Sequence, residues 1–172
     1  MFAWRSKWGV KPALLLALVS VLLVAVPVSA DRPIVITNEH DDDYKMGPQP
    51  CPGIEVWDHE VWTERITLYY DSKDNLVRVI VHAEGTDNFY DPKNPDAVLS
   101  GHFVVNVHFD APTWEGYMTG VPWHITVPGY GTVVVRAGRW LEKEYPYGHI
   151  AGKDSFDSPQ DMEQFCSLLA GD

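Results

Sequence analysis

The sequence has only two cysteines among its 172 residues, and its 13 lysines and arginines are outnumbered by 24 aspartates and glutamates. It lacks the Gly-x-Ser-x-Gly turn of serine hydrolases, the His-Glu-x-x-His pair of zinc proteases and a phosphate-cradling glycine loop. It also contains no Cys-x-x-Cys redox motif and no internal repeat. These absences remove the usual sequence support for a hydrolase, a redox protein or a nucleotide-binding enzyme.

The first 30 residues have the pattern of a signal peptide. Three basic residues precede an apolar run over residues 13–26, and Val28-Ser29-Ala30 supplies the small residues of a signal-peptidase site. The apolar run is shorter than the roughly 20 residues that a bilayer span requires. We expect cleavage after Ala30, a secreted or extracytoplasmic location and no membrane insertion afterwards. An uncleaved membrane anchor is the alternative.

The rest of the chain is strongly acidic. Three basic residues and no acidic ones lie in the first 30 positions, so the remaining 142 residues carry ten basic and 24 acidic side chains, a net charge of −14. Such a surface repels phosphate backbones and anionic membranes. We expect no nucleic-acid partner and no cofactor, and a small molecule or an extracellular protein as the partner. This length suits one domain.

Residues 31–50 are predicted to be a flexible leader, and residues 51–170 a single domain. The acidic run from His40 to Asp43 and the Gly47-to-Pro50 segment both resist packing. Residues 34–36 are apolar enough for a short edge strand. A loosely held divalent ion at the acidic run is the less favoured interpretation, because nothing nearby fixes the ligand geometry.

Cys51 and Cys166 are predicted to form a disulfide, because an exported protein meets oxidising conditions. The two residues are 115 positions apart. Closing a loop of that length stabilises a fold by about 4–5 kcal/mol in the chain-entropy model. A redox or nucleophilic cysteine is the alternative.

The segment from residue 54 to residue 110 has a β pattern, apart from one long polar loop. Alternation is clearest in Val98–Phe109, where Leu99, Phe103 and Val105 face one way and His102 and His108 the other. The other predicted strands are Ile54–Trp62, Thr63–Tyr70 and Leu76–Glu84, and Trp114–Thr119 leads into the hairpin that follows.

A hairpin is predicted over residues 121–141. Its turn, Pro128-Gly129-Tyr130-Gly131, contains two glycines that can adopt the positive φ of a tight reversal. One short helix follows near the end of the chain, with Ser158 as N-cap and Pro159 in the first position. Phe165, Cys166 and Leu169 lie on its apolar face.

We therefore predict a mainly β protein, an antiparallel meander of about seven to nine strands with one C-terminal helix. A barrel resembling lipocalins in outline is preferred, and a two-sheet sandwich is the alternative.

Histidines and aromatic residues are the first candidates for a ligand site. His102, His108 and His124 could bind a ligand or simply line the polar face of the sheet. His102 and His108 are about 20 Å apart along a strand and cannot share a metal ion. Trp114 and Tyr117 lie beside a predicted turn and could contact a ligand or pack in the core.

The segment from Gly85 to Asp96 is predicted to be a polar loop and offers a second candidate site. Calcium binds about six to eight oxygens, and this segment is rich in oxygen-bearing side chains. Its spacing matches no calcium-loop motif, and Asp, Asn and Pro are equally typical of an ordinary strand connection. The candidate calcium ligands are Asp87, Asn88, Asp91 and Asp96.

Three segments stand out as short motifs: Cys51-Pro52-Gly53, Pro122-x-His124-Ile125-Thr126-Val127-Pro128-Gly129-x-Gly131 with Ala137-Gly138-Arg139, and Cys166-x-x-Leu169. Together they resemble a group of small exported bacterial proteins with no assigned activity. The resemblance implies one exported β domain with a terminal disulfide, and it implies no catalytic residue.

Two functions are compatible with these patterns. The preferred one is a non-enzymatic exported domain that binds a small molecule, in a cavity, or a surface partner. The alternative is an extracellular hydrolase that uses histidine and carboxylate side chains on the polar face of the sheet. It requires His102, His108 or His124 to lie within hydrogen-bond reach of an acidic group.

Overall fold

The computed structural model describes residues 32–47, 49–141 and 148–171. The predicted signal peptide, residues 1–30, lies outside this part of the chain. Among the described residues no helix has the length and hydropathy that crossing a membrane would take. The elements are β1 (Ile34–Lys45), β2 (Trp57–Tyr70), β3 (Leu76–Asp91), β4 (Asn94–Asp110), β5 (Glu115–Val127), β6 (Gly131–Leu141), β7 (Gly148–Asp154), the 3₁₀ turn η1 (Ser155–Asp157) and α2 (Pro159–Ala170).

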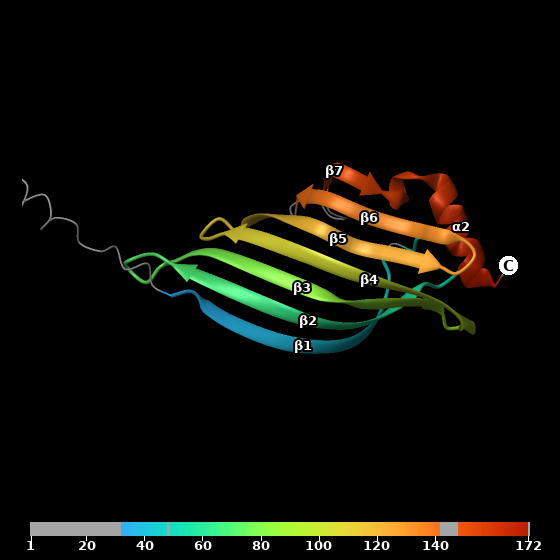
Figure 1. Cartoon of the computed structure of the whole chain (residues 1–172), viewed down its shortest axis with the longest axis horizontal. Helices are drawn as coiled ribbons and strands as arrows, with labels where there is room; N and C mark the ends of the chain where they lie inside the picture. The colour runs from blue at the N-terminus through green and yellow to red at the C-terminus, as the bar shows by residue number, and fades with distance from the viewer. Residues whose placement is uncertain (1–31, 48, 142–147, 172) are drawn as a thin grey trace, which may run out of the picture. The chain divides into compact units, whose positions relative to one another are not determined.

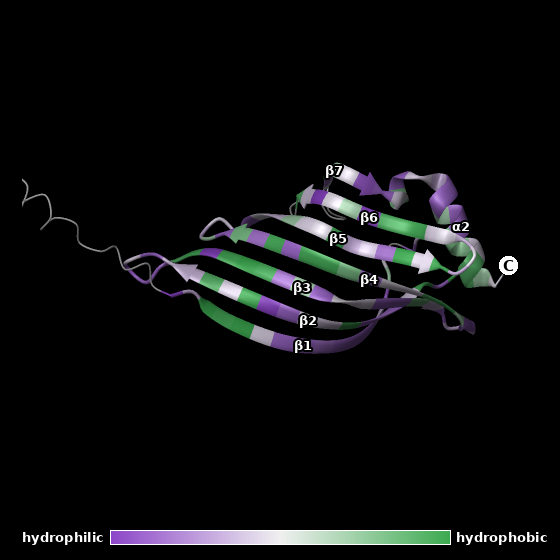
Figure 2. Ribbon diagram, in the orientation of Figure 1, coloured by the Kyte–Doolittle hydropathy of each residue, from purple (hydrophilic) through white to green (hydrophobic). Residues whose placement is uncertain are grey.

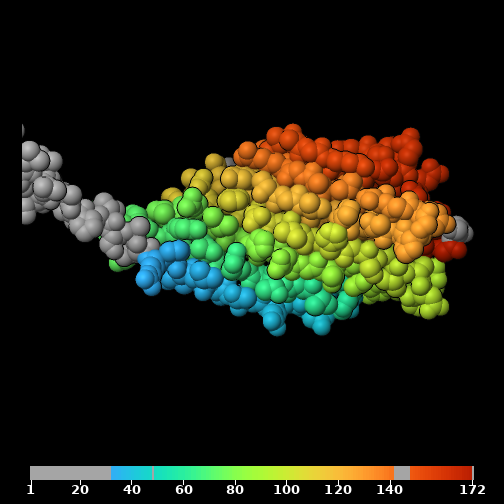
Figure 3. All heavy atoms as spheres, viewed as in Figure 1, coloured from blue at the N-terminus to red at the C-terminus, as the bar shows by residue number. Residues whose placement is uncertain are grey.

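The seven strands form one antiparallel sheet in chain order, from β1 to β7 (Figure 1). The space-filling view shows the same order as a run of colours across the molecule (Figure 3). The predicted antiparallel meander with one C-terminal helix is therefore confirmed. The predicted barrel is wrong: β1 and β7 are the two edges of the sheet, and a barrel requires its first and last strands to pair.

A full strand replaces most of the predicted leader. β1 pairs with β2 in unbroken register from Ile34↔Leu68 to Lys45↔Trp57. Figure 2 shows that the second half of β1 is hydrophilic, which is why the sequence suggested a solvated segment. Acidic side chains are common on edge strands, where they discourage pairing with another chain. The prediction of a flexible leader is wrong over residues 34–45.

Two further predictions differ from the structure. β2 is one continuous strand, where the sequence suggested two. β3 extends to Asp91 and β4 begins at Asn94, so the predicted loop from Gly85 to Asp96 is mostly strand. Only a tight turn separates β3 from β4, and the Asp91 side chain accepts a hydrogen bond from the backbone N–H of Lys93.

We call the sheet face that packs against α2 the inner face, and the opposite one the outer face. Phe89, Leu99 and Ile125 on the inner face pack against Phe165 and Leu169 of the helix. A second apolar cluster, further along the same face, contains Ala83, Phe103 and Val105, with Trp62 and Met118 against it.

The predicted disulfide, the C-terminal helix and the β5–β6 turn are all confirmed. Cys51 and Cys166 form a disulfide. The Ser158 side chain accepts a hydrogen bond from the backbone N–H of Asp161, and α2 ends at Gly171 with φ of 82°. The β5–β6 turn forms as expected, with Gly129 and Gly131 at φ of 84° and 79°.

Candidate functional site

A shallow groove crosses the outer face of β1, β2, β3 and β4, with a volume of about 740 Å³. Its floor is one row of cross-strand partners, His40↔Trp62↔Gly85↔Phe103, whose side chains belong to the inner face. The two neighbouring rows point outward and form its walls. One wall consists of Glu39, Thr63, Glu84 and Val104, and the other of Asp41, Val61, Thr86 and His102. We call this feature the outer groove.

The floor depends on a glycine. A Cβ atom at position 85 would lie against the Cβ of Trp62 and 2.5 Å from the carbonyl oxygen of Val61. The backbones of β2 and β3 therefore approach more closely here than any residue with a side chain permits. The Trp62 ring lies on the inner face, where its centroid is 6.3 Å from that of Phe103.

The walls of the outer groove are acidic. Glu39, Asp41 and Glu84 are exposed, and the lining contains neither lysine nor arginine. Two neighbouring histidines contact these acids, at 3.7 Å from His59 to Asp41 and 3.7 Å from His82 to Glu84. Val61 and Val104 add apolar surface between the charges. The groove therefore presents a negative, partly apolar strip.

A second feature lies on the inner face, between the two apolar clusters. Asp58 and Glu60 of β2 point to this face, and Asp87 of β3 is the cross-strand partner of Glu60. Their carboxylate oxygens lie within 4.8 Å of one another. Asp58 and Asp87 have no exposed surface. We call these three residues the acidic trio.

The carboxyl oxygens of the acidic trio have few hydrogen-bond partners within the protein. The Tyr44 hydroxyl donates a hydrogen bond to Asp58, at 3.2 Å, and also lies within hydrogen-bonding distance of Glu60. As carboxylates, Asp87 and Oδ1 of Asp58 are buried without a hydrogen-bond donor among the described residues. Only a protonated carboxyl could form a hydrogen bond between Asp87 and Glu60. None of the ion pairs formed within that part of the chain involves the trio.

Burial and mutual repulsion favour the protonated forms of these carboxyls. Burial, together with the charges of Asp58 and Glu60, raises the pKa of Asp87 to about 9. Burial and the charge of Glu60 raise the pKa of Asp58 to about 7. Burial also raises the pKa of Glu60, and burial and the charge of Asp58 raise the pKa of Tyr44. At an effective dielectric constant of about 20, two full charges about 4.8 Å apart repel by roughly 3.5 kcal/mol.

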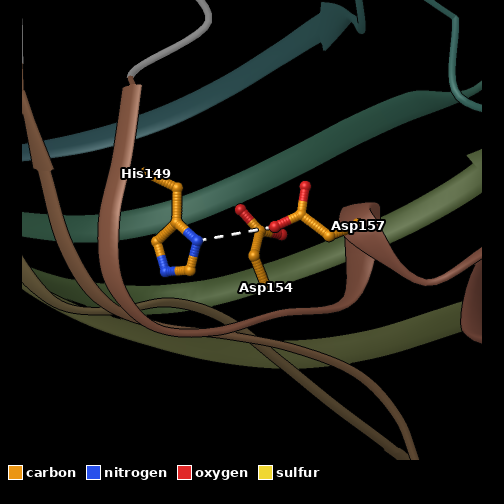
Figure 4. Close-up of side chains that lie close together, drawn as sticks. All are labelled: His149, Asp154 and Asp157. Atoms are coloured by element: carbon orange, nitrogen blue, oxygen red, sulfur yellow. Dashed lines mark ion pairs between the residues drawn. The ribbon is translucent and has the colours of Figure 1, made fainter.

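A third cluster, at the other end of the sheet, is structural. His149 of β7 lies 3.5 Å from Asp157 of η1, and Asp154 is beside them (Figure 4). The Arg136 guanidinium donates hydrogen bonds to both oxygens of Asp154, at 2.8 to 2.9 Å. Burial opposes ionisation of Asp154, but the Arg136 hydrogen bonds lower its pKa overall. With Arg136 already neutralising it, Asp154 is a poor ligand for a cation.

The structure separates the sequence-predicted ligand residues, with the three histidines and Tyr117 on the outer face and Trp114 in the β4–β5 turn. His102 and His124 are cross-strand partners whose ring nitrogens are 3.3 Å apart, and His102 belongs to a wall of the outer groove. His108 stacks on Tyr117, with ring centroids 4.7 Å apart. Trp114 is exposed at the β4–β5 turn. The five residues therefore do not converge on one site.

The four candidate calcium ligands are also dispersed. Asp87 is on the inner face, whereas Asn88 is on the outer face and accepts a hydrogen bond from Ser100. Asp91 caps the β3–β4 turn, and Asp96 is exposed on β4. Of these four residues, only Asp87 belongs to the acidic trio.

Sequence reasoning missed both the trio and the groove. The available signal was the alternation Asp58-x-Glu60-x-Trp62, which places two acids on the same face as a core tryptophan. Their meeting with Asp87 depends on strand register, which the sequence alone does not supply.

Comparisons of the chain with protein-family models, curated proteins and solved structures give no match. The resemblance to small exported bacterial proteins therefore stays a prediction, and the functional argument has to rest on the chain's own residues.

Proposed function

We propose that this protein is a non-enzymatic exported binding domain, and that its outer groove holds a short basic peptide segment of an extracellular partner. The observation that carries the proposal is the groove itself: one row of strand partners forms a floor, between two walls that carry three carboxylates and neither lysine nor arginine. Helix α2 packs against the inner face of the sheet, which leaves the outer face available to a partner.

The dimensions favour an extended chain. Four neighbouring strands spaced about 4.8 Å apart span about 14 Å, which matches about four residues of extended peptide. Valine side chains in the walls, Val61 and Val104, can pack against the aliphatic stems of lysine or arginine. The carboxylates of Glu39, Asp41 and Glu84 can then pair with the charged ends.

The lining argues against a sugar ligand. Carbohydrate sites stack sugars on exposed aromatic rings, but the side chain of Trp62 lies on the inner face with the core. His102 is the one aromatic side chain in the walls. The strongly negative charge of the chain also favours a cationic partner, because complementary potentials speed association.

The hydrolase alternative receives less support. It requires a histidine of the polar face within reach of an acidic group. Within the described part of the chain, no ion pair joins His102, His108 or His124 to a carboxylate. His102 and His124 contact each other instead.

Fluorescence anisotropy with a labelled Lys/Arg hexapeptide tests the proposal. We expect saturable binding that weakens as the salt concentration rises, because exposed ion pairs are screened. The triple variant Glu39→Gln, Asp41→Asn, Glu84→Gln should bind at least about tenfold more weakly, since three exposed ion pairs of about 0.5 kcal/mol each are lost.

Two controls give this experiment its meaning. An Asp/Glu hexapeptide of the same length should not bind. The variant Asp96→Asn removes an exposed acid on β4 that does not line the groove, and it should bind like the unchanged protein. If the triple variant also binds the basic peptide as well as the unchanged protein does, the groove is not the binding site.

A further inference from the structure

Two buried carboxyls and a half-buried one, with no basic partner among the described residues, need an explanation that the outer groove does not provide. Asp87 lies fully buried, and both of its oxygens lack a hydrogen-bond donor among the described residues. Asp58 adds a third such oxygen. Unpaired polar atoms in the interior are costly, so native proteins rarely keep them without water, an ion or a function.

The geometry points to a site for a hard divalent cation, with calcium as the best fit, held by Asp58, Glu60 and Asp87 on the inner face of β2 and β3. One carboxylate oxygen from each of the three side chains lies within 4.8 Å of one from each of the other two. Asp87 contributes to this cluster with a buried carboxylate whose oxygens have no hydrogen-bond donor among the described residues. Three ligand oxygens at about 2.3–2.6 Å from a central calcium ion would have this mutual spacing.

The chemistry of the ligand set selects the ion. All three side chains supply carboxylate oxygen, the donor that calcium and magnesium prefer, and the trio contains no sulfur or imidazole to attract zinc or copper. The Tyr44 hydroxyl, already on Asp58 and Glu60, can supply a further oxygen or order a bound water. Calcium is favoured over magnesium because it tolerates irregular geometry and more ligands.

The trio is most accessible on its β1 side. Glu60 is half-buried and Tyr44 is exposed, whereas Asp58 and Asp87 are closed off. A cation can therefore approach through Glu60 and Tyr44 and reach the two deeper carboxylates. Its ligands would come from two adjacent strands, so a bound ion would fasten β2 to β3.

The competing interpretation is that the trio holds protons alone. In that case the carboxyls share protons at neutral pH, and the raised pKa values of Asp58 and Asp87 describe the working state. A cation and a proton compete for the same oxygens, so binding the ion would release protons. Cation binding, which only the first interpretation predicts, can be measured.

Isothermal titration calorimetry decides between a cation site and a trio that holds only protons. The purified protein is first treated with EDTA and dialysed into metal-free buffer at pH 7.5. We expect CaCl₂ to bind at one site per chain, with MgCl₂ weaker. Asp87→Asn should weaken binding by at least tenfold, and the exposed-site control Asp96→Asn should leave it unchanged. Glu60→Gln, at the half-buried member of the trio, provides a second variant if Asp87→Asn does not fold.

Each outcome is decisive. Stoichiometric binding of either cation that is lost in Asp87→Asn or Glu60→Gln supports the proposal. The proposal is overturned if neither cation binds. It is also overturned if the unchanged protein and both variants bind equally well, because the ion would then lie elsewhere on the acidic surface. The result is separate from the peptide experiment, because the trio lies on the inner face and the groove variants on the outer face.

Discussion

Without metal, Asp87 should make the protein less stable as the pH rises. Burial and the charges of Asp58 and Glu60 raise its pKa to about 9 in the fold, from an ordinary value of 3.8. Between pH 5 and pH 7.5 the folded state thus keeps a proton that the unfolded state has released. Stability then falls with pH by about 1.4 kcal/mol per unit, or about 3 kcal/mol over this range.

Asp87→Asn removes this pH-dependent loss of stability, because asparagine does not titrate. The free energy of unfolding of the variant, relative to the unchanged protein, should therefore increase by about 3 kcal/mol between pH 5 and pH 7.5. Urea unfolding in the presence of EDTA, followed by tryptophan fluorescence, measures this difference at each pH. A difference that stays constant or shrinks as the pH rises would refute the reasoning. Asp96→Asn should show no such trend.

Three further variants test how the fold is held together. Replacing both Cys51 and Cys166 by serine should lower the free energy of unfolding by about 4–5 kcal/mol, measured in urea, because the loop they close spans 115 residues. Arg136→Met should cost about 3–5 kcal/mol in the same assay, because it leaves the buried carboxylate of Asp154 unpaired. Gly85→Ala should cost about 1–3 kcal/mol, seen as a lower melting temperature, because the added Cβ has no room.

Local patterns were sufficient for much of the fold. The alternation in β4 predicted its two faces, with Phe103 and Val105 in the core and His102 on the outer face. The capping residues of α2 and the turn glycines of the β5–β6 hairpin were also recognisable, because each acts through its own immediate neighbours. These features depend on a few consecutive residues.

Features that depend on pairing between distant strands were not predictable. β1 has an acidic sequence typical of a solvated segment, and it becomes a strand because β2 offers a partner along its whole length. The acidic trio forms only in the register that places Glu60 opposite Asp87. A shift of one residue would move one of these side chains to the other face, so the trio cannot be derived without the register.

The outer groove shows the same dependence. It requires one row to align across four strands, from His40 to Phe103, and it requires a glycine at the closest approach of β2 and β3. The sequence gives no sign that Gly85 differs from a turn glycine. Its role becomes visible only when the neighbouring strand is in place.

The most direct test of the proposed function is NMR mapping of the peptide contact. In a titration of ¹⁵N-labelled protein with the Lys/Arg hexapeptide, we predict backbone amide shifts concentrated in residues 39–41, 61–63, 84–86 and 102–104. The amides of the β4–β5 turn and of α2 should not move. Shifts concentrated outside the four groove segments, or no saturable shifts at all, would contradict the proposal that the outer groove is the binding site.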